Sequence, residues 1–382
     1  MITIGILLPG STLYPSIGMD FIQGLRSCLS FHQYDPVDIQ PAVIGFGVKE
    51  NDIYAAVEKC LLVSNADVVI AYLSDYHAEK LAPLFAAAGK LLIIINAGSA
   101  YPVNTAAIPN TVFHAFDDCV CCFLTGKYAA RQEGGHGAIM ATSFFDGGYS
   151  HCHAMNASFN KSGGETKMQF VSRYKKEEFS TETLEAFIQS NPDVKKILAV
   201  FSADTARFLF EKMMDTQKEY GLQWYASPMM FDCTPGDFAE AKPSAPDMCG
   251  YTNWVPELNI EANQVFLKYY KDSNGKNANL FSMQGWESAL FLMAYLETRK
   301  NAAGTTEAIE QLTGKEIDSP RGTVRLNRQK YMQGPVHFVQ STGNLQLTVG
   351  ETITDLSAAW EEMCGQVPKE VIASWRNTYL CI

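Results

Sequence analysis

The chain has 382 residues, which is long for one hydrophobic core and suits two domains of about 150 to 200 residues each. Hydrophobic residues make up 47% and charged residues 19%, as in ordinary soluble globular proteins, and no apolar run approaches the ~18 residues of a bilayer-spanning helix. The formal net charge is -11, and no basic run is longer than the pairs Lys175-Lys176 and Lys195-Lys196. Because phosphate contacts require clustered Lys and Arg, this pattern argues against nucleic acid as a partner.

The ten cysteines are scattered among apolar residues rather than arranged as a disulfide framework. In a chain of this size that pattern predicts reduced, buried thiols of a cytosolic protein. Met1 leads directly into the first apolar run, with no basic segment or A-x-A cleavage site. Two interpretations stay open: a cytoplasmic protein that starts at Met1, and a periplasmic protein whose signal peptide was removed and replaced by a Met.

Strand-like and helix-like segments alternate from the N-terminus. The first strand, Ile2–Pro9, stops at Pro9-Gly10, and apolar residues at helical spacing follow, which indicates the opening βα unit of a parallel sheet. Ligands of such sheets bind beside the carboxyl ends of strands, so the loop from Pro9 to Ile17 is a candidate pocket wall. The other elements predicted in this half are strands at Asp38–Phe46, Ala66–Tyr72 and Leu91–Ile95, and helices near Ile17–Leu29, Asn51–Ser64 and Ala78–Ala88.

After a strand at Thr111–Phe116, the alternation restarts and predicts a second α/β layer. Its strands are expected at Gly137–Ala141, Met168–Ser172, Lys196–Phe201, Gln223–Ala226 and Met248–Thr252. Its helices are expected at Asp118–Arg131, after Gly148, at Thr181–Gln189 and at Ala203–Tyr220. Short connectors, rather than one Gly/Ser-rich linker, suggest that the chain passes between the two layers more than once.

Taken in order, these segments resemble the leucine/isoleucine/valine-type extracellular ligand-binding receptors, which are substrate-binding proteins of ABC transporters with the type I periplasmic-binding-protein-like fold. The resemblance spans about residues 1 to 350. It is carried by IGILLPGSTLYPSIGMDFIQGLR at the start, ADVVIAYLSDYHAEKLAPLFAAAGKLLIIINAGSA at 66–100, HGAIMATSFFDGGYSH at 136–151, KKILAVFSADTARFLF at 195–210, QGWESALFLMAYL at 284–296 and SPRGTVRLN at 319–327.

The resemblance implies an α/β protein with two doubly wound, Rossmann-like lobes joined by three hinge crossings, expected near Asp117, Tyr251 and Gly334. The implied N-terminal lobe comprises residues 1–117 and 252–334, and the C-terminal lobe comprises 118–251 and 335–382. Closure of the lobes buries a ligand between the carboxyl edges of the two sheets. The residues after Gly350 extend past the usual family end, and we expect them to pack as a helical extension on the second lobe through apolar residues at roughly helical spacing, namely Trp360, Met363, Val367, Val371 and Trp375.

In the first lobe, the resemblance places ligand contacts in the loops after two strands. Ser74, Asp75 and Tyr76 precede a helix, where family members often offer a hydroxyl and backbone amides to a ligand carboxylate. Asp75 stands where a small hydroxyl residue is usual; it either contacts the ligand or caps its helix, and the second is favoured because Asp is a preferred N-cap. After the next strand, Ala97 and Ser99 offer a carbonyl and a hydroxyl to the cleft.

In the cleft-facing segments of the family, this chain has mostly apolar and aromatic residues. Phe145, Tyr149 and Phe201 fall where rings close over the ligand, although ordinary core packing remains the alternative for each ring. The segment after Ala226, which contains Met229, has no acid to receive an α-ammonium group, and Asp232 is the nearest one. Phe281 belongs to another cleft-facing segment. This lining predicts a neutral or aromatic ligand rather than an aliphatic α-amino acid.

The chain has no constellation typical of a metal centre or an enzyme. Cys119, Cys121 and Cys122 fall in one predicted helix and cannot all point at one ion, and His151 to His153 fit a solvated turn. G-x-S-x-G, G-x-x-x-x-G-K-[ST] and H-E-x-x-H motifs do not occur. We therefore expect no catalysis, no cofactor and no metal.

The predicted function is reversible binding of a small organic solute, such as an amino acid, an amide or an aromatic acid, as the substrate-binding component of an ABC-type uptake system. The alternative is a cytoplasmic sensor of the same fold that passes its ligand state to a regulatory partner protein. The cysteines and the start at Met1 favour the sensor, whereas the motif order favours neither. The expected partners are the ligand and either an ABC permease or a regulator, without membrane insertion.

Overall fold

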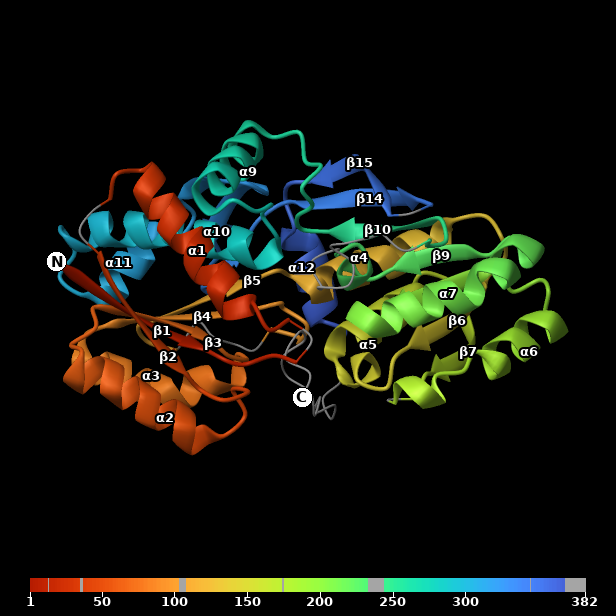
Figure 1. Cartoon of the computed structure of the whole chain (residues 1–382), viewed down its shortest axis with the longest axis horizontal. Coiled ribbons are helices and arrows are strands. Elements are labelled where there is room, and N and C mark those ends of the chain that lie inside the picture. Colours follow the sequence, from red (N-terminus) through yellow and green to blue (C-terminus); the bar gives the residue numbers. More distant parts are fainter. Residues whose placement is uncertain are drawn as a thin grey trace.

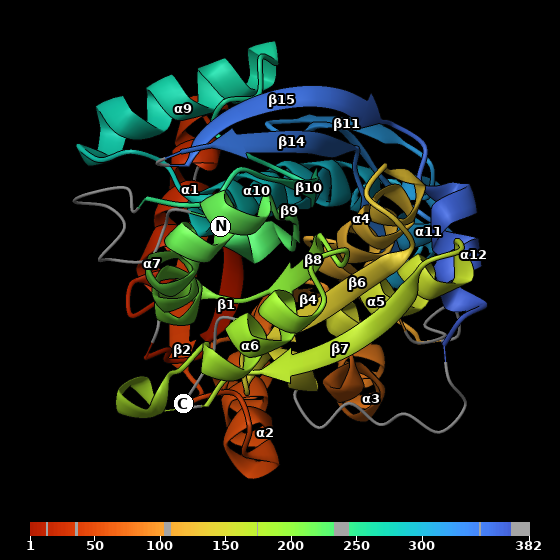
Figure 2. The same ribbon diagram turned by 90° about the vertical axis from the view of Figure 1, so that its right-hand side faces the viewer.

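The chain folds into two α/β lobes, each built on one sheet, in a computed structural model that describes residues 1–12, 14–34, 37–102, 108–173, 175–232, 244–343 and 345–367. Figure 1 shows the lobes side by side along the long axis, and Figure 2 views the second lobe end-on. The predicted α/β class with two doubly wound lobes is confirmed. Within the described ranges, no helix combines the length and apolar character that a membrane span requires.

The first sheet has eight strands in the order β11-β12-β13-β5-β4-β3-β1-β2. The strands are β1 (Ile2–Leu8), β2 (Val37–Val43), β3 (Val68–Tyr72), β4 (Leu91–Asn96), β5 (Thr111–Ala115), β11 (Glu316–Ser319), β12 (Gly322–Leu326) and β13 (Tyr331–Gln333). β13 pairs in parallel with β5, so a late segment of the chain joins the N-terminal sheet. β3 and β4 are buried at every residue, which explains their uninterrupted apolar sequences.

Helices cover both faces of this sheet (Figure 1). The elements are α1 (Ile17–Phe31), α2 (Glu50–Glu58), a π-helical turn (Lys59–Val63), α3 (Tyr76–Ala88), α9 (Glu261–Asn274), α10 (Leu280–Arg299) and α11 (Thr305–Leu312). α1 and α10 pack on one face in one apolar cluster, whereas α2 and α3 belong to a second cluster on the other face. The single helix expected at Asn51–Ser64 is thus an α-helix that ends in a π-helical turn.

α1 and α10 approach each other closely because each presents a glycine to the other. A Cβ atom at Gly285 of α10 would lie 2.0 Å from the carbonyl oxygen of Phe21, and one at Gly24 of α1 would lie 1.9 Å from that of Ser282. Both distances are far below van der Waals contact. The two glycines therefore hold the start of α10, including Phe281, tightly against the first lobe.

The second sheet has seven strands in the order β15-β14-β10-β9-β8-β6-β7. Its strands are β6 (Gly137–Thr142), β7 (Glu165–Val171), β8 (Lys196–Val200), β9 (Gln223–Ala226), β10 (Met248–Thr252), β14 (Val336–Thr342) and β15 (Gln346–Ile353). Its helices are α4 (Asp118–Arg131), α5 (Ser150–Lys161), α6 (Glu182–Ser190) and α7 (Ala203–Tyr220). β7, β6, β8, β9 and β10 run parallel, while β14 and β15 complete the sheet in antiparallel pairing.

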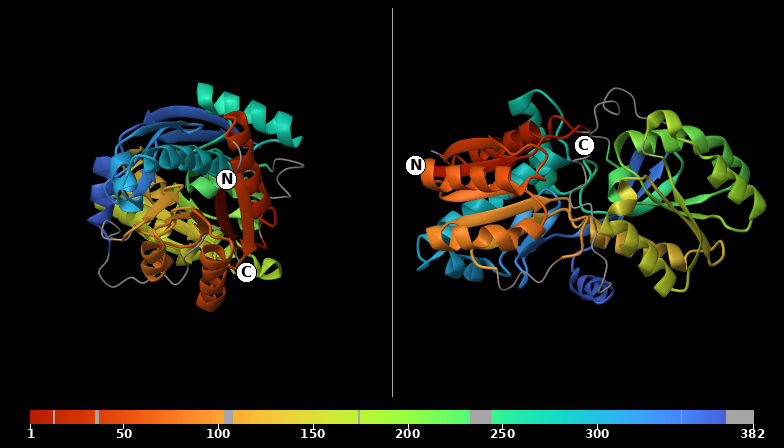
Figure 3. Two further views of the ribbon diagram at one scale, coloured as in Figure 1. Left: turned by 90° about the vertical axis from the view of Figure 1, so that its left-hand side faces the viewer. Right: turned by 90° about the horizontal axis from the view of Figure 1, so that it is seen from below.

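The chain passes from one sheet to the other between β5 and α4, between β10 and α9, and between β13 and β14. The right-hand view of Figure 3 shows these connections running between the lobes. Asp117 stands in the first crossing with a left-handed backbone, φ 54°. The short crossings allow one lobe to rotate against the other, as the hinge hypothesis requires.

The last described helix, α12 (Ser357–Cys364), contacts both lobes. The Trp360 ring lies 5.2 Å from that of Tyr331 on β13 of the first sheet, and Glu362 forms an ion pair with Lys127 of α4 at 2.5 Å. We expected this extension on the second lobe alone; the structure places it across both, because β13 brings Tyr331 next to it. Val367 follows the end of α12 and is 38% exposed, so its predicted packing is wrong, and Val371 and Trp375 lie outside the described residues.

The eight cysteines in the described ranges form no disulfide. Six of them are buried, and burial raises the pKa of thiols such as Cys28 and Cys122. Cys233 and Cys381 lie outside the described residues. These observations agree with a chain whose thiols pack as small apolar side chains.

Candidate functional site

The carboxyl ends of the parallel strands in the two sheets face each other, and the loops after them meet. Tyr14, in the loop after β1, donates its hydroxyl to Asp232 Oδ2 of the second lobe at 3.3 Å. The backbone N–H of His151 at the start of α5 donates to the Ser99 carbonyl after β4 at 3.0 Å. Tyr101 Oη and His153 Nδ1 lie 2.7 Å apart. The cleft between the lobes is therefore closed along these loops.

The structure gives Asp75 a role that neither sequence interpretation included. Its side chain makes no capping hydrogen bond to α3, although it holds the N-cap position. Instead, Asn96 Nδ2 donates to Asp75 Oδ1 at 2.8 Å, and the Tyr331 hydroxyl donates to Oδ2. Both partners belong to the first lobe, so Asp75 ties β4 and β13 together.

The two neighbours of Asp75 also have partners within the first lobe. Ser74 Oγ lies 3.2 Å from Nδ1 of His77, one turn along α3. Tyr76 is 44% exposed, and Lys80 Nζ lies 4.5 Å from its ring centroid. The proposed contacts of Ser74 and Tyr76 with a ligand stay predictions.

The second predicted anchor, Ala97 and Ser99, lies at the lobe interface. The Ala97 carbonyl, which we expected to face the cleft, accepts the backbone N–H of Asp118 at 3.2 Å. Ser99 is buried, and its carbonyl accepts the N–H of His151 from the other lobe. The Ala97 carbonyl is thus already hydrogen-bonded to the first crossing, because α4 begins directly beside the end of β4.

Three predicted apolar residues are buried in apolar packing that runs through both lobes. Phe201 and Met229 of the second lobe and Phe281 of the first are buried in one apolar cluster. The Phe281 ring lies 5.2 Å from that of Tyr14 in an edge-to-face arrangement. The apolar packing is therefore continuous from one lobe to the other.

The other two predicted rings lie on the loop after β6 and at the start of α5. Phe145 is half-buried and packs edge-to-face on Phe144 at 5.5 Å. Tyr149 is buried and stacks on the His151 ring at 5.7 Å. Asp146 holds this loop by accepting hydrogen bonds from Ser143 and Ser202, and burial raises its pKa to about 6.

Sequence reasoning assigned no ligand contact to four buried polar residues that end a parallel strand or follow one in the chain. Tyr72 Oη, Asp118 Oδ2, Ser227 Oγ and both ring nitrogens of His151 have no hydrogen-bond partner among the residues that the structure describes. All four side chains are at most 2% exposed, and the solvated turn expected at His151 is wrong because this residue is buried in α5. Buried polar groups nearly always have partners, so each of these groups is open to a ligand or a water molecule. A signal was present in the sequence: two adjacent acids, Asp117 and Asp118, separate an apolar strand from an apolar helix.

Two acids at the first crossing, Asp117 and Asp118, have pKa values above the usual range of a carboxyl group. Burial raises the pKa of Asp118 well above its usual range, and the charges of Asp117 and Asp232 raise it further. Burial also raises the pKa of Asp117 to about 7, against the opposing effect of Arg321. Asp232, the acid nearest in sequence to the segment after Ala226, therefore also acts on Asp118 through its charge.

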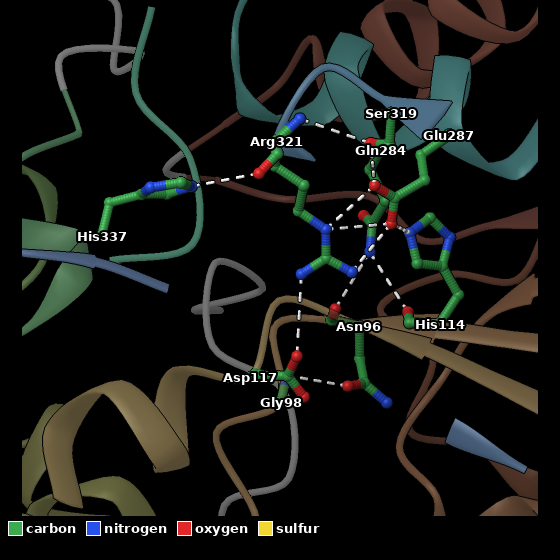
Figure 4. A network of polar contacts seen from close by, with 9 residues as sticks. All are labelled: Asn96, Gly98, His114, Asp117, Gln284, Glu287, Ser319, Arg321 and His337. Atoms are coloured by element: carbon green, nitrogen blue, oxygen red, sulfur yellow. Dashed lines mark hydrogen bonds and ion pairs between the residues drawn. The ribbon is translucent and has the colours of Figure 1, made fainter. Parts of the chain in front are cut away.

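A buried network of hydrogen bonds and ion pairs reaches the first crossing at Asp117 (Figure 4). Arg321 is fully buried, and its Nε and Nη2 donate to the Glu287 carboxylate at 2.9 and 2.8 Å, while Nη1 lies 3.6 Å from Asp117 Oδ2. Glu287 also lies 2.8 Å from His114 Nε2. His337 on β14 of the second sheet donates its Nε2 hydrogen to the Arg321 carbonyl at 3.0 Å. The network thereby joins two of the three crossings.

The sequence of this chain matches the family model of the periplasmic binding proteins over residues 1–344. The chain belongs to the periplasmic binding protein family. A comparison with curated proteins finds no match.

Several solved structures have the same fold. The ABC transporter substrate-binding protein from Sphaerobacter thermophilus is 15% identical over 93% of this chain and 98% of that chain, with TM-score 0.75. An R. palustris ABC transporter solute-binding protein in complex with benzoate is 19% identical over 93% and 98%, with TM-score 0.71. A branched-chain amino acid ABC transporter periplasmic ligand-binding protein from Burkholderia xenovorans is 11% identical over 94% and 97%, with TM-score 0.71.

In this periplasmic binding protein, the described residues show no group of three His, Cys, Asp or Glu side chains that could hold a metal ion. Cys119, Cys121 and Cys122 are buried in α4 among apolar neighbours. The buried polar groups at the cleft are a phenol, a carboxyl, a hydroxyl and an imidazole, which together suit hydrogen bonding to an organic solute.

His151 makes the stability of this binding protein depend on pH. Burial lowers its pKa from 6.5 to about 4. Between these values the unfolded chain binds a proton that the folded protein excludes, so stability that is fully present above pH 6.5 is lost as the pH falls. We expect a loss of roughly 2 to 3 kcal/mol by pH 4.5 that the variant His151→Phe does not show.

The measurement is urea unfolding of both proteins between pH 7 and 4.5, with the exposed His136→Phe as control. Phe keeps the stacking against Tyr149, so the variant isolates the titration of the imidazole. A difference between wild type and His151→Phe that stays constant over this pH range contradicts the prediction.

Proposed function

We propose that this protein reversibly binds a small organic solute between its lobes, as the substrate-binding component of an ABC-type uptake system, without converting the solute chemically. The observation that carries the proposal is the meeting of both lobes at one apolar cluster, next to buried polar groups that lack partners among the described residues. Apolar burial supplies affinity at ~25 cal/mol per Å², and the polar groups supply selectivity.

The relatives support this role over that of a cytoplasmic sensor. The R. palustris and B. xenovorans structures are ABC transporter binding proteins, one of them in complex with benzoate. An aromatic or aliphatic solute suits the buried apolar side chains of Phe201, Met229 and Phe281. The partner of the closed, loaded protein is then an ABC permease.

Binding should close the lobes around the three crossings. A thermal-shift screen of amines, amides, amino acids and aromatic acids identifies a stabilising solute, and small-angle scattering with that solute should give a smaller radius of gyration than without it. Tyr14→Phe removes the hydroxyl that reaches Asp232 across the lobes and should weaken binding about 2- to 10-fold.

Tyr269→Phe is the matched control, because the Tyr269 hydroxyl bonds only to exposed Ser30 among the contacts described on its lobe. This variant should bind as the wild type does. If no solute of the four classes raises the melting temperature or changes the radius of gyration, the proposed function is wrong.

A further inference from the structure

Asp118 is a buried acid without a complete set of partners. It is the first residue of α4, its side chain is 2% exposed, and its Oδ2 has no hydrogen-bond partner among the residues described. A carboxylate in such a place is strongly unfavourable unless a cation or donor meets it. Two further acids lie close by, Asp117 at the preceding position and Asp232, whose charge acts on Asp118 from the second lobe.

Tyr72 is a second, independent indication of a missing group at the same place. Tyr72 ends β3 and lies in register with Ile95 of β4, while the backbone N–H of Asp118 donates to Ala97 just beyond β4. The two side chains therefore flank the same strand end. The Tyr72 hydroxyl is fully buried and, like Asp118 Oδ2, has no partner in the described part of the chain. The charge of Asp118 raises the pKa of the Tyr72 phenol, which agrees with their proximity.

The charge balance around these groups is negative. In the described ranges, Lys196 and Arg321 are the only Lys and Arg side chains that are buried. Lys196 donates to the Gln132 carbonyl at the start of β8, at the opposite end of the sheet from the cleft. Arg321 donates twice to Glu287. Neither base is available to a carboxylate of the solute.

Resting on the proposed function, we infer that the solute is a protonated organic amine without a carboxylate, whose ammonium group binds Asp118 and Tyr72 at the ends of β5 and β3. The ammonium donates to Asp118 Oδ2 and to the phenol oxygen of Tyr72. Its apolar part lies toward the cluster that contains Tyr14, Phe281 and Phe201, and aromatic faces also attract cations. The sequence predicts a neutral or aromatic ligand; a protonated amine departs from the neutral alternative because Asp118 is a buried acid.

The first test compares solutes that differ only in the charged group. Phenethylamine, 2-phenylethanol, 3-phenylpropionate and phenylalanine form one set, and hexylamine, 1-hexanol and hexanoate form a second. Calorimetry should show at least one of the two amines binding 10-fold or more tightly than the matched alcohol and acid, and phenylalanine binding more weakly than phenethylamine.

The second test uses variants at the two positions. Asp118→Asn keeps the shape and removes the charge, so amine binding should weaken roughly 10- to 100-fold. In the absence of solute the same variant should melt a few degrees higher, because it removes an unpaired buried acid; a purely structural role of Asp118 would lower the melting temperature. Tyr72→Phe should weaken amine binding up to about 10-fold, and the exposed Asp215→Asn of α7 should match the wild type.

Proton release gives a third, separate readout. Binding of an ammonium group to Asp118 should release a proton from this acid, measured near pH 6.5 as a dependence of the binding enthalpy on the buffer. The charges of Asp117 and Asp232 also act on Asp118, so the decisive comparison is with Asp118→Asn, in which this release should disappear.

The outcomes separate this inference from the proposed function. Tight amine binding that Asp118→Asn abolishes supports the inference. Binding of an alcohol or acid with lobe closure, but of no amine, overturns the inference and leaves the proposed function standing. If phenylalanine binds as tightly as phenethylamine, the inference that the solute lacks a carboxylate is wrong. If neither amine stabilises the protein, the inference that the solute is an amine is wrong.

Discussion

Replacing Arg321 with methionine should lower the free energy of unfolding by about 3 to 5 kcal/mol. Arg321 and Glu287 are both fully buried, and the guanidinium donates twice to the carboxylate. The pKa of Glu287 lies well below its usual range, because Arg321 and His114 stabilise the charged form against desolvation. Without Arg321, a buried carboxylate is left without its main counter-charge.

Urea denaturation of the variant and the wild type measures this effect. Arg325→Met on the same hairpin is the control, since Arg325 is exposed and should lose less than about 0.5 kcal/mol. The double variant Arg321→Met with Glu287→Leu should lose less than the single variant, because it removes both charges. A loss below about 1 kcal/mol for Arg321→Met, or a double variant that loses as much stability as Arg321→Met alone or more, contradicts this assignment.

Replacing Gly285 with alanine should lower the free energy of unfolding by about 3 kcal/mol. The added Cβ atom would lie 2.0 Å from the Phe21 carbonyl oxygen and 2.9 Å from the Leu25 backbone nitrogen. Backbone atoms cannot rotate away as a side chain can, so α1 and α10 must move apart. That shift would also displace Phe281 at the start of α10 and weaken solute binding.

Thermal and urea unfolding of Gly285→Ala check the expected loss. Gly350→Ala in β15 is the matched control, because a Cβ atom there meets Phe338 atoms at an ordinary 3.5 Å. The control should stay within about 0.5 kcal/mol of wild type. Equal stabilities of the two variants would show that the helices can separate without loss.

The elements of the parallel sheets were predictable because local sequence decides them. Buried strands such as β3 and β4 need apolar residues on both faces, and the helices between them show apolar spacing that no other structure would use. The order of these segments was enough to predict the two lobes and the family. Strand ends then placed Ser99 and Phe201 near the cleft, and the family resemblance placed Phe281 there.

The chemistry of the cleft was decided by contacts between residues distant in the chain. Asp75 serves the first lobe because β13 brings Tyr331, 256 positions away, onto its carboxylate. Asp118 became a candidate ligand group only when its burial and missing partner were known. The sequence by itself determined which segments bury apolar surface, because that depends on side-chain pattern along each element. Only the tertiary structure decided which acids have hydrogen-bond partners, as Asp75 does, and which lack one, as Asp118 Oδ2 does among the described residues. The reason is that such pairing depends on distances between residues far apart in the chain, which folding sets.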